Sequence, residues 1–179
     1  LPFSSKGLEE RLGILLQPGT PVILITEDPG QAEAALSQLR GGTFPVLYVV
    51  EGSINAWYEN DLPMEILPEV SVHEISRAVP GGNVVVLDVR DPIEWEMGHV
   101  PGAILISLGA LRGRIQELPV GIGIAVICEA GVRSSSAASI LQAEGFTEVS
   151  NVSEGTGGYR KAGLPLEFLE QGSDHEGIS

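Results

Sequence analysis

The stretch "NVVVLDV", residues 83–89, is a continuous apolar run rich in β-branched residues. Such a run is typical of a strand that is buried on both faces in a parallel sheet. The segments around it alternate between strand-like and helix-like patterns, which implies right-handed crossovers and helices on both faces of the sheet. The sequence therefore predicts a three-layer α/β domain over residues 67–170, with a mostly parallel five-stranded sheet.

The neighbouring segments supply the other elements of this predicted domain. Before the run, "VSVHEISRAV" (70–79) predicts a short strand and a helix. After it, "DPIEWEMGHV" (91–100) predicts a short helix with Pro92 in its first turn. The remaining predicted strands are 102–107, 123–128 and 148–152, and the remaining predicted helices are 108–118, 133–146 and a closing turn over 155–163.

Charge and composition exclude several classes of partner. The chain has 24 acidic and 10 basic residues and a formal charge of −14, which repels phosphate backbones and anionic lipid headgroups. No apolar run reaches the roughly 18 residues of a membrane span. The single cysteine cannot form an internal disulfide. We therefore expect a soluble cytoplasmic protein that binds neither nucleic acid nor membranes.

Residues 1–66 resemble part of the following domain at a constant offset. The segment "GLEERLGILLQPGTPVILIT" (7–26) aligns with "GALRGRIQELPVGIGIAVIC" (109–128), and "AALSQLRGGTF" (34–44) aligns with "SAASILQAEGF" (136–146). The register continues to "DLPME" against "GLPLE". An offset that holds across helix, strand and turn signals predicts an internal repeat, in which residues 1–66 are a partial copy of the same fold.

Cys128 stands at the carboxyl end of a predicted central strand, where ligands gather in parallel sheets. Residues 129–132 form the following loop, and Arg133 and Ser134 open the next helix. Loop amides that curl into a helix start form an anion-binding concavity, and its field, with Arg133 nearby, favours the nucleophilic thiolate. Gly131 permits a turn that a β-carbon would obstruct. The alternative is a small, inert, buried thiol.

Two motifs resemble those of rhodanese-like sulfurtransferase domains over essentially the whole predicted domain. The first is "LDVRDPIEWEMGHVPGAILI" (87–106), and the second is "CEAGVRS" (128–134), followed by "GLPLE". One departure is Glu154-Gly155 with Tyr159, where the family usually has a Gly-Gly pair and a Trp, and we expect this to alter packing more than chemistry. The matched positions of the first motif are Asp88, Arg90, Glu94, Trp95, Gly98, His99, Val100, Pro101, Gly102 and Ala103.

The resemblance implies an activity. Phosphatase-like family members carry one more residue between the cysteine and the arginine, so the loop 129–132 implies transfer of sulfane sulfur rather than phosphate. Cys128 would form a persulfide with thiosulfate or a low-molecular-weight persulfide, and a thiol or cyanide would then remove the sulfur, with no cofactor. The implied site comprises catalytic Cys128 and Arg133, substrate-binding Glu129, Ala130, Gly131, Val132 and Ser134, and supporting Asp88, Arg90 and His99.

Other features of the chain carry smaller expectations. Neither His73 nor His175 has a partner at metal-ligand spacing, so we expect no metal site. The N-terminal copy has Thr26 and Gln31 at the positions of the cysteine and the arginine, so we expect it to be catalytically inert. The polar residues 171–179 predict a mobile tail.

The N-terminal copy lacks any counterpart of residues 84–102, so we expect an upstream domain or a second chain to complete it. A degenerate copy followed by an active one resembles the C-terminal part of bacterial proteins that begin with a metallo-β-lactamase-type persulfide dioxygenase. A second class of function also stays open at this point. In it, the chain is a sulfur-binding, redox-sensing or interaction module of a larger protein, without turnover.

Overall fold

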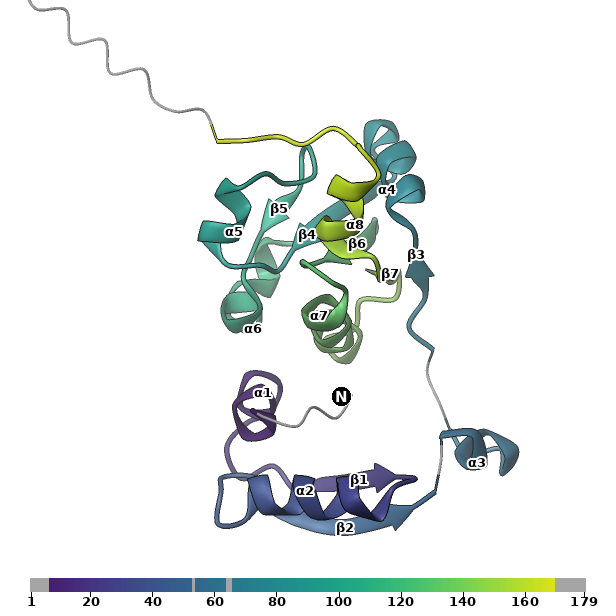
Figure 1. Ribbon diagram of the computed structural model, residues 1–179. Helices are drawn as coiled ribbons and strands as arrows, with labels where there is room; N and C mark the ends of the chain where they lie inside the picture. The colour runs from purple at the N-terminus through teal and green to yellow at the C-terminus, as the bar shows by residue number, and fades with distance from the viewer. Residues whose placement is uncertain (1–6, 53, 64–65, 170–179) are drawn as a thin grey trace, which may run out of the picture. The chain divides into compact units, whose positions relative to one another are not determined.

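The computed structural model describes residues 7–52, 54–63 and 66–169 of the chain (Figure 1). It divides into two compact units, residues 1–66 and residues 67–179, and each is described by itself. The predicted tail over 171–179 lies outside the described residues.

The second unit contains a five-stranded sheet in which every strand pair is parallel. The strand order is β3-β7-β6-β4-β5, which puts the run 83–89 and the strand before Cys128 next to each other near the centre. The predicted parallel five-stranded sheet is confirmed. The strands are β3 (Glu69–Val70), β4 (Val84–Asp88), β5 (Ile104–Leu105), β6 (Gly123–Ile127) and β7 (Val149–Val152).

Helices cover both faces of this sheet, which confirms the predicted three layers. Figure 1 shows α4 and α8 on one face and α6 and α7 on the other. The helices are α4 (Val72–Ala78), α5 (Pro92–Glu96), α6 (Leu111–Arg114), α7 (Val132–Ala143) and α8 (Gly155–Lys161), with 3₁₀ turns η1 (Val79–Gly81), η2 (Leu108–Ala110) and η3 (Ile115–Glu117).

The core explains why the central strands are apolar at consecutive positions. Val86 and Ile127 pack with Tyr159 of α8 in one buried cluster. Leu87 and Val126, each adjacent to one of these residues along its strand, are also fully buried, and their side chains point to the opposite face. Both faces of β4 and β6 are therefore removed from water, as the sequence pattern predicts.

Local signals place helix α5 beside the loop that follows β4. Asp91 and Glu94 form a reciprocal capping box around Pro92. The helix stops at Glu96, earlier than the predicted range 91–100, because Gly98 adopts a left-handed φ of 109°.

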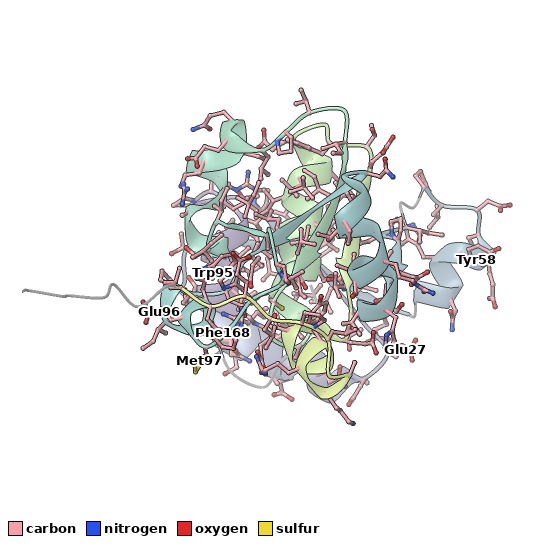
Figure 2. The ribbon with its side chains drawn as sticks, turned by 90° about the horizontal axis from the view of Figure 1, so that it is seen from above. Glu27, Tyr58, Trp95, Glu96, Met97 and Phe168 are labelled. Carbon is pink, nitrogen blue, oxygen red and sulfur yellow. The ribbon has the colours of Figure 1, made fainter. Side chains whose placement is uncertain are left out.

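The C-terminal segment of the unit is fastened to this same region by what we call the clasp, residues 166–168 against 98–102. The backbones of His99 and Glu167 exchange two hydrogen bonds, of 3.0 and 2.9 Å. A β-carbon on Gly98 would lie 3.0 Å from the Phe168 ring, so the backbone and the ring approach closely. Figure 2 labels Trp95, Met97 and Phe168 in this region.

The predicted helix over 108–118 is wrong as a single element. The structure has η2, the four-residue helix α6 and η3 in its place. Gly109 and Gly113 weaken helix formation within the segment, and Arg114 takes a φ of −123°, outside the helical range. The apolar positions of the segment do face the core, since Leu111 is fully buried. The segment nevertheless does not form one continuous α-helix.

The first unit pairs two parallel strands, β1 (Val22–Thr26) and β2 (Val46–Glu51). Its helices are α1 (Leu8–Leu15), α2 (Pro29–Leu39) and α3 (Ile54–Glu59), and its core cluster comprises Leu8, Leu12, Ala35, Leu39 and Phe44. The element order repeats that of α6, β6, α7, β7 and α8 in the second unit. A common origin of the two units stays a prediction, because a shared element order does not by itself show one.

Large apolar side chains remain exposed on one face of the strand pair β1–β2. Ile23 lies opposite Tyr48 and Ile25 opposite Val50 in the register, and all four are exposed. The alternating residues of β1, Val22 and Leu24, pack instead against the core cluster of the first unit. Among the described residues, none of the helices is long and apolar enough to cross a membrane.

Candidate active site

The site is built where β4 and β6 end side by side. Asp88 pairs with Ile127 across the two strands, and the Val89 amide donates to the Ile127 carbonyl at 2.9 Å. The residues that follow, Arg90 after β4 and Cys128 after β6, therefore emerge at the same edge of the sheet. This is the carboxyl edge, at which the sequence analysis expected the ligand to bind.

The loop after Cys128 is clamped against the start of α8. Gly131 has a φ of 83°, and a β-carbon there would lie 2.3 Å from the Ser153 carbonyl oxygen. The Thr156 amide donates to the Cys128 carbonyl at 2.7 Å, and the Thr156 hydroxyl donates to the same oxygen at 3.2 Å. The loop backbone is thus held by a segment that lies far along the chain, and Gly131 is required for that close approach.

The Cys128 thiol lies at the first turn of α7 and is shielded from solvent. The residue is 1% exposed. The Ser134 amide donates to Cys128 Sγ at 3.4 Å, and the Ser134 hydroxyl lies 3.4 Å from the same sulfur. Hydrogen-bond donors and the positive end of the helix dipole therefore face the sulfur, an arrangement that supports negative charge on it.

Arg133 is turned toward α5, and its guanidinium donates to Glu94 through Nη1 and Nη2, both at 2.7 Å. These hydrogen bonds lower the pKa of Glu94 to about 2, with the backbone amide of Asp91 adding to the effect. The same bonds raise the pKa of Arg133. Sequence reasoning did not give Glu94 a role in the site, because its partner lies far along the chain and no local spacing signals the pair.

Asp88 and Arg90 form a buried ion pair at the end of β4. Arg90 Nη2 lies 2.7 Å from Asp88 Oδ2, and the same nitrogen donates to the Gly98 carbonyl at 3.0 Å. Both side chains are fully buried. The pair fastens the loop after α5 to the sheet. The supporting role that the resemblance implies for Asp88 and Arg90 stays a prediction.

One nitrogen of Arg90 faces the thiol loop. Arg90 Nη1 is buried and has no hydrogen-bond partner among the described residues, and Glu129 Oε2 lies 3.8 Å from it. The other oxygen of Glu129 accepts a hydrogen bond from Arg160 of α8. Sequence reasoning missed Arg160, since nothing near it in the sequence marks it as part of the site.

The His99 side chain lies in the clasp, where neighbouring residues hold its ring. Its ring stacks on Trp95 with centroids 3.5 Å apart, and Nδ1 lies 3.2 Å from the Trp95 carbonyl oxygen. Its Nε2 lies 3.9 Å from Glu167. These contacts hold the turn that follows α5, and the supporting role that the resemblance implies for His99 stays a prediction.

The remaining loop residues border the site at the surface. Ala130 and Val132 are exposed on either side of the buried Gly131. Within the described part of the chain, no group of three or more His, Cys, Asp and Glu side chains is placed to hold a metal ion. The arrangement thus presents a hydrogen-bonded thiol, a clamped loop and several ion pairs, which are parts suited to nucleophilic chemistry at sulfur.

Known proteins resemble this second unit. A thiosulfate sulfurtransferase of Pseudoalteromonas translucida is 29% identical over 86 residues, covering 48% of this chain and 82% of that protein. A sulfurtransferase of Allochromatium vinosum is 29% identical over 84 residues, covering 47% of this chain and 78% of that protein. A Bacillus subtilis protein named as a candidate sulfur carrier is 37% identical over 90 residues, but the match covers only 49% of that protein and 50% of this chain.

Solved structures and the family description agree with these relatives. A rhodanese-related protein of Thermoplasma volcanium superposes with a TM-score of 0.52 and 27% identity, covering 56% of this chain and 97% of the other. Residues 71–162, just over half of the chain, match the family described as the Rhodanese-like domain. On the fold, the thiol loop and this match together, the chain belongs to the rhodanese-like domain family.

Proposed function

We propose that the chain is a sulfurtransferase that carries sulfane sulfur on Cys128. The observation that carries this proposal is the hydrogen-bonded setting of the Cys128 sulfur at the start of α7. Relatives named sulfurtransferases support it at the level of sulfur transfer. We extend it to a donor, either thiosulfate or a low-molecular-weight persulfide, and to an acceptor, either a thiol or cyanide.

The reaction proceeds in two displacements at sulfur. In the first, the Cys128 thiolate attacks the outer sulfur of a persulfide RSSH, the S–S bond of the donor breaks, and RS⁻ leaves with the bonding electron pair. The proton stays on the outer sulfur, which gives Cys128–S–SH. With thiosulfate, sulfite leaves as the dianion and Cys128–S–S⁻ remains. In the second displacement, an acceptor thiolate takes the outer sulfur and the Cys128 thiolate is restored.

The Ser134 amide and hydroxyl support this cycle, because they face Cys128 Sγ, which carries negative charge before the first displacement and again after the second. The clamp between residues 128–131 and 153–157 holds these donors in place. Preorganised donors of this kind stabilise developing charge without reorganising during the reaction.

Intact-mass measurement tests the proposal. Reduced, folded protein incubated with thiosulfate or glutathione persulfide should gain one sulfur atom, and later addition of cyanide should remove it as thiocyanate. The Cys128→Ser variant should gain nothing. A chain that gains no sulfur from either donor would contradict the proposal.

Burial of the thiol favours a second candidate function. Cys128 is 1% exposed, so a persulfide formed there would be shielded from acceptors in solution. In this candidate, the chain stores or senses sulfur without useful turnover. Continuous thiocyanate production from excess thiosulfate and cyanide separates the two, since a storage module stops after one equivalent.

We also propose that residues 1–66 are a partial, catalytically inert copy of the active domain. The shared element order supports this, as does the presence of Thr26 where the second unit has Cys128. Without a nucleophile at that position, the first unit contributes no sulfur chemistry of this kind.

A further inference from the structure

Negative charge accompanies each arginine beside the thiol loop. All three arginines lie opposite a carboxylate of the described chain, so none of them presents an uncompensated positive charge to an incoming anion. A dianion such as thiosulfate gains little binding free energy from a site of this kind, because its binding depends on surplus positive charge. The pairs are Arg90 with Asp88, Arg133 with Glu94, and Arg160 with Glu129.

Glu129 has a special place in this set, because it directly follows Cys128 and faces two arginines at once. One carboxylate oxygen accepts from Arg160, and the other lies 3.8 Å from Arg90 Nη1. That nitrogen is buried and lacks a hydrogen-bond partner among the described residues. The Glu129 carboxylate therefore already places negative charge next to Arg90 Nη1.

We infer that Glu129 is a specificity-determining residue that disfavours dianionic donors and favours donors whose charge lies away from the reacting sulfur, such as low-molecular-weight persulfides. This inference rests on the proposed sulfurtransferase function. Its physical basis is Coulombic, since the carboxylate of the residue that follows the nucleophile repels the sulfonate group of thiosulfate. Because the Glu129 side chain is 43% exposed, salt screens this repulsion, and its effect is largest at low ionic strength.

The rim of the loop is consistent with this preference. Ala130 and Val132 are exposed, with Val132 at 52%. A persulfide carries a carbon chain next to its sulfur atoms, and that chain can cover apolar rim surface that thiosulfate leaves wet. The charge of Glu129 and the apolar residues at the rim of the loop therefore both favour persulfide donors.

Donor selectivity provides the first test, with cyanide as the common acceptor. Glu129→Gln should raise the ratio of kcat/KM for thiosulfate to kcat/KM for glutathione persulfide about tenfold, and more at low salt. Glu129→Asp, which keeps the charge, should leave this ratio within about twofold of its value in the parent chain. The matched control is Glu117→Gln, because Glu117 is also paired with an arginine and is 44% exposed, against 43% for Glu129.

A second measurement tests the inference without requiring turnover. Iodoacetate is anionic and iodoacetamide is neutral, so the ratio of their alkylation rates at Cys128 reports exclusion of negative charge. We expect Glu129→Gln to raise this ratio about fivefold, with Glu129→Asp and Glu117→Gln leaving it within about twofold. A purely structural role for Glu129 would change both alkylation rates together.

The outcomes separate the two proposals. An unchanged alkylation ratio in Glu129→Gln overturns the inference, whether or not the chain transfers sulfur. Equal gains for thiosulfate and persulfide also overturn it. A raised alkylation ratio in a chain that gains sulfur from neither donor overturns the sulfurtransferase proposal and leaves the charge exclusion by Glu129 standing.

Discussion

Arg133 is paired within the protein before any donor binds. Its two terminal nitrogens donate to the two oxygens of Glu94, a bidentate geometry that is among the stronger side-chain pairings. The pair joins the first turn of α7 to α5. It therefore links the thiol loop to the loop after β4, and it stabilises the folded chain in addition to any effect on the donor.

The pH dependence of stability tests this pair. The folded-state pKa of Glu94 is about 2, below its ordinary value of 4.5, so the pair stabilises the fold fully above pH 4.5. That stabilisation is lost as the pH falls toward 2. Glu94→Gln should reduce the free energy of unfolding by about 1–3 kcal/mol at neutral pH, and the deficit should shrink as the pH falls through this window.

Urea denaturation at a series of pH values measures the effect. Glu96→Gln is the control, because Glu96 is an exposed carboxylate on the same helix (Figure 2). The control should follow the parent chain at each pH. A deficit in Glu94→Gln that stays constant down to pH 2 would count against the pair.

Gly131 is expected to tolerate no side chain. Gly131→Ala places a β-carbon 2.3 Å from the Ser153 carbonyl oxygen at a φ of 83°, so the clamp must open. Gly145→Ala is the matched control, since Gly145 has a φ of 92° but no atom within 4 Å of the added carbon. Both substitutions incur the backbone cost of about 1–2 kcal/mol, and Gly131→Ala alone should also reduce sulfur loading at least about tenfold. Equal loading in the two variants would exclude the clamp as a requirement.

At the scale of elements, the end of β4 depends on a buried charge pair. Asp88→Asn removes the partner of Arg90, which is fully buried, and an uncompensated buried charge costs about 3–5 kcal/mol. Glu144→Gln breaks the exposed pair with Arg112 and should cost less than about 1 kcal/mol. Equilibrium unfolding in urea compares the two. Similar losses in both variants would contradict the structural role of Asp88.

The elements that the sequence predicts well are those whose signal is local. The run 83–89 forms β4, and the segment after Cys128 forms α7, because apolar periodicity and glycine positions act over neighbouring residues. The segment 108–118 fails because its apolar pattern is helical while Gly109 and Gly113 weaken the backbone.

Within the site, the sequence marks the thiol loop but not its partners. Glu94 and Arg160 reach the loop through the packing of α5 and α8 around the sheet, so their pairing depends on tertiary structure. No spacing along the chain encodes such contacts. The burial of Cys128 also depends on tertiary packing, and the sequence allowed a buried thiol only as one of two alternatives.

At the scale of the whole molecule, we predict that the second unit folds and carries sulfur without the first. The described clusters of the first and second units are each built from residues of one unit alone. A chain that begins at residue 67 should therefore fold and retain sulfur loading on Cys128 within about twofold of the parent. Intact-mass measurement with a persulfide donor checks the loading, and a folded fragment that has lost all loading would show that the site needs residues 1–66.

Removal of residues 1–66 should also change how the chain associates. The exposed strand face with Ile23, Ile25, Tyr48 and Val50 is an apolar surface of the kind that soluble chains cover by association. Light scattering on the parent and on the shortened chain measures the change in assembly, and thermal denaturation measures the change in melting temperature. Identical assembly and melting temperature would mean that the first unit has no stabilising role.

The clasp has a mechanical consequence for the second unit. Along the chain, the contact between Glu167 and His99 lies beyond α8, and α8 holds the loop that carries Cys128. Tension applied from the C-terminal side must break the two backbone bonds of the clasp before it loads α8. These bonds, with the Phe168 ring against Gly98, take up the first part of a pulling force, so the loop that carries the sulfur keeps its geometry while the end of the domain is strained.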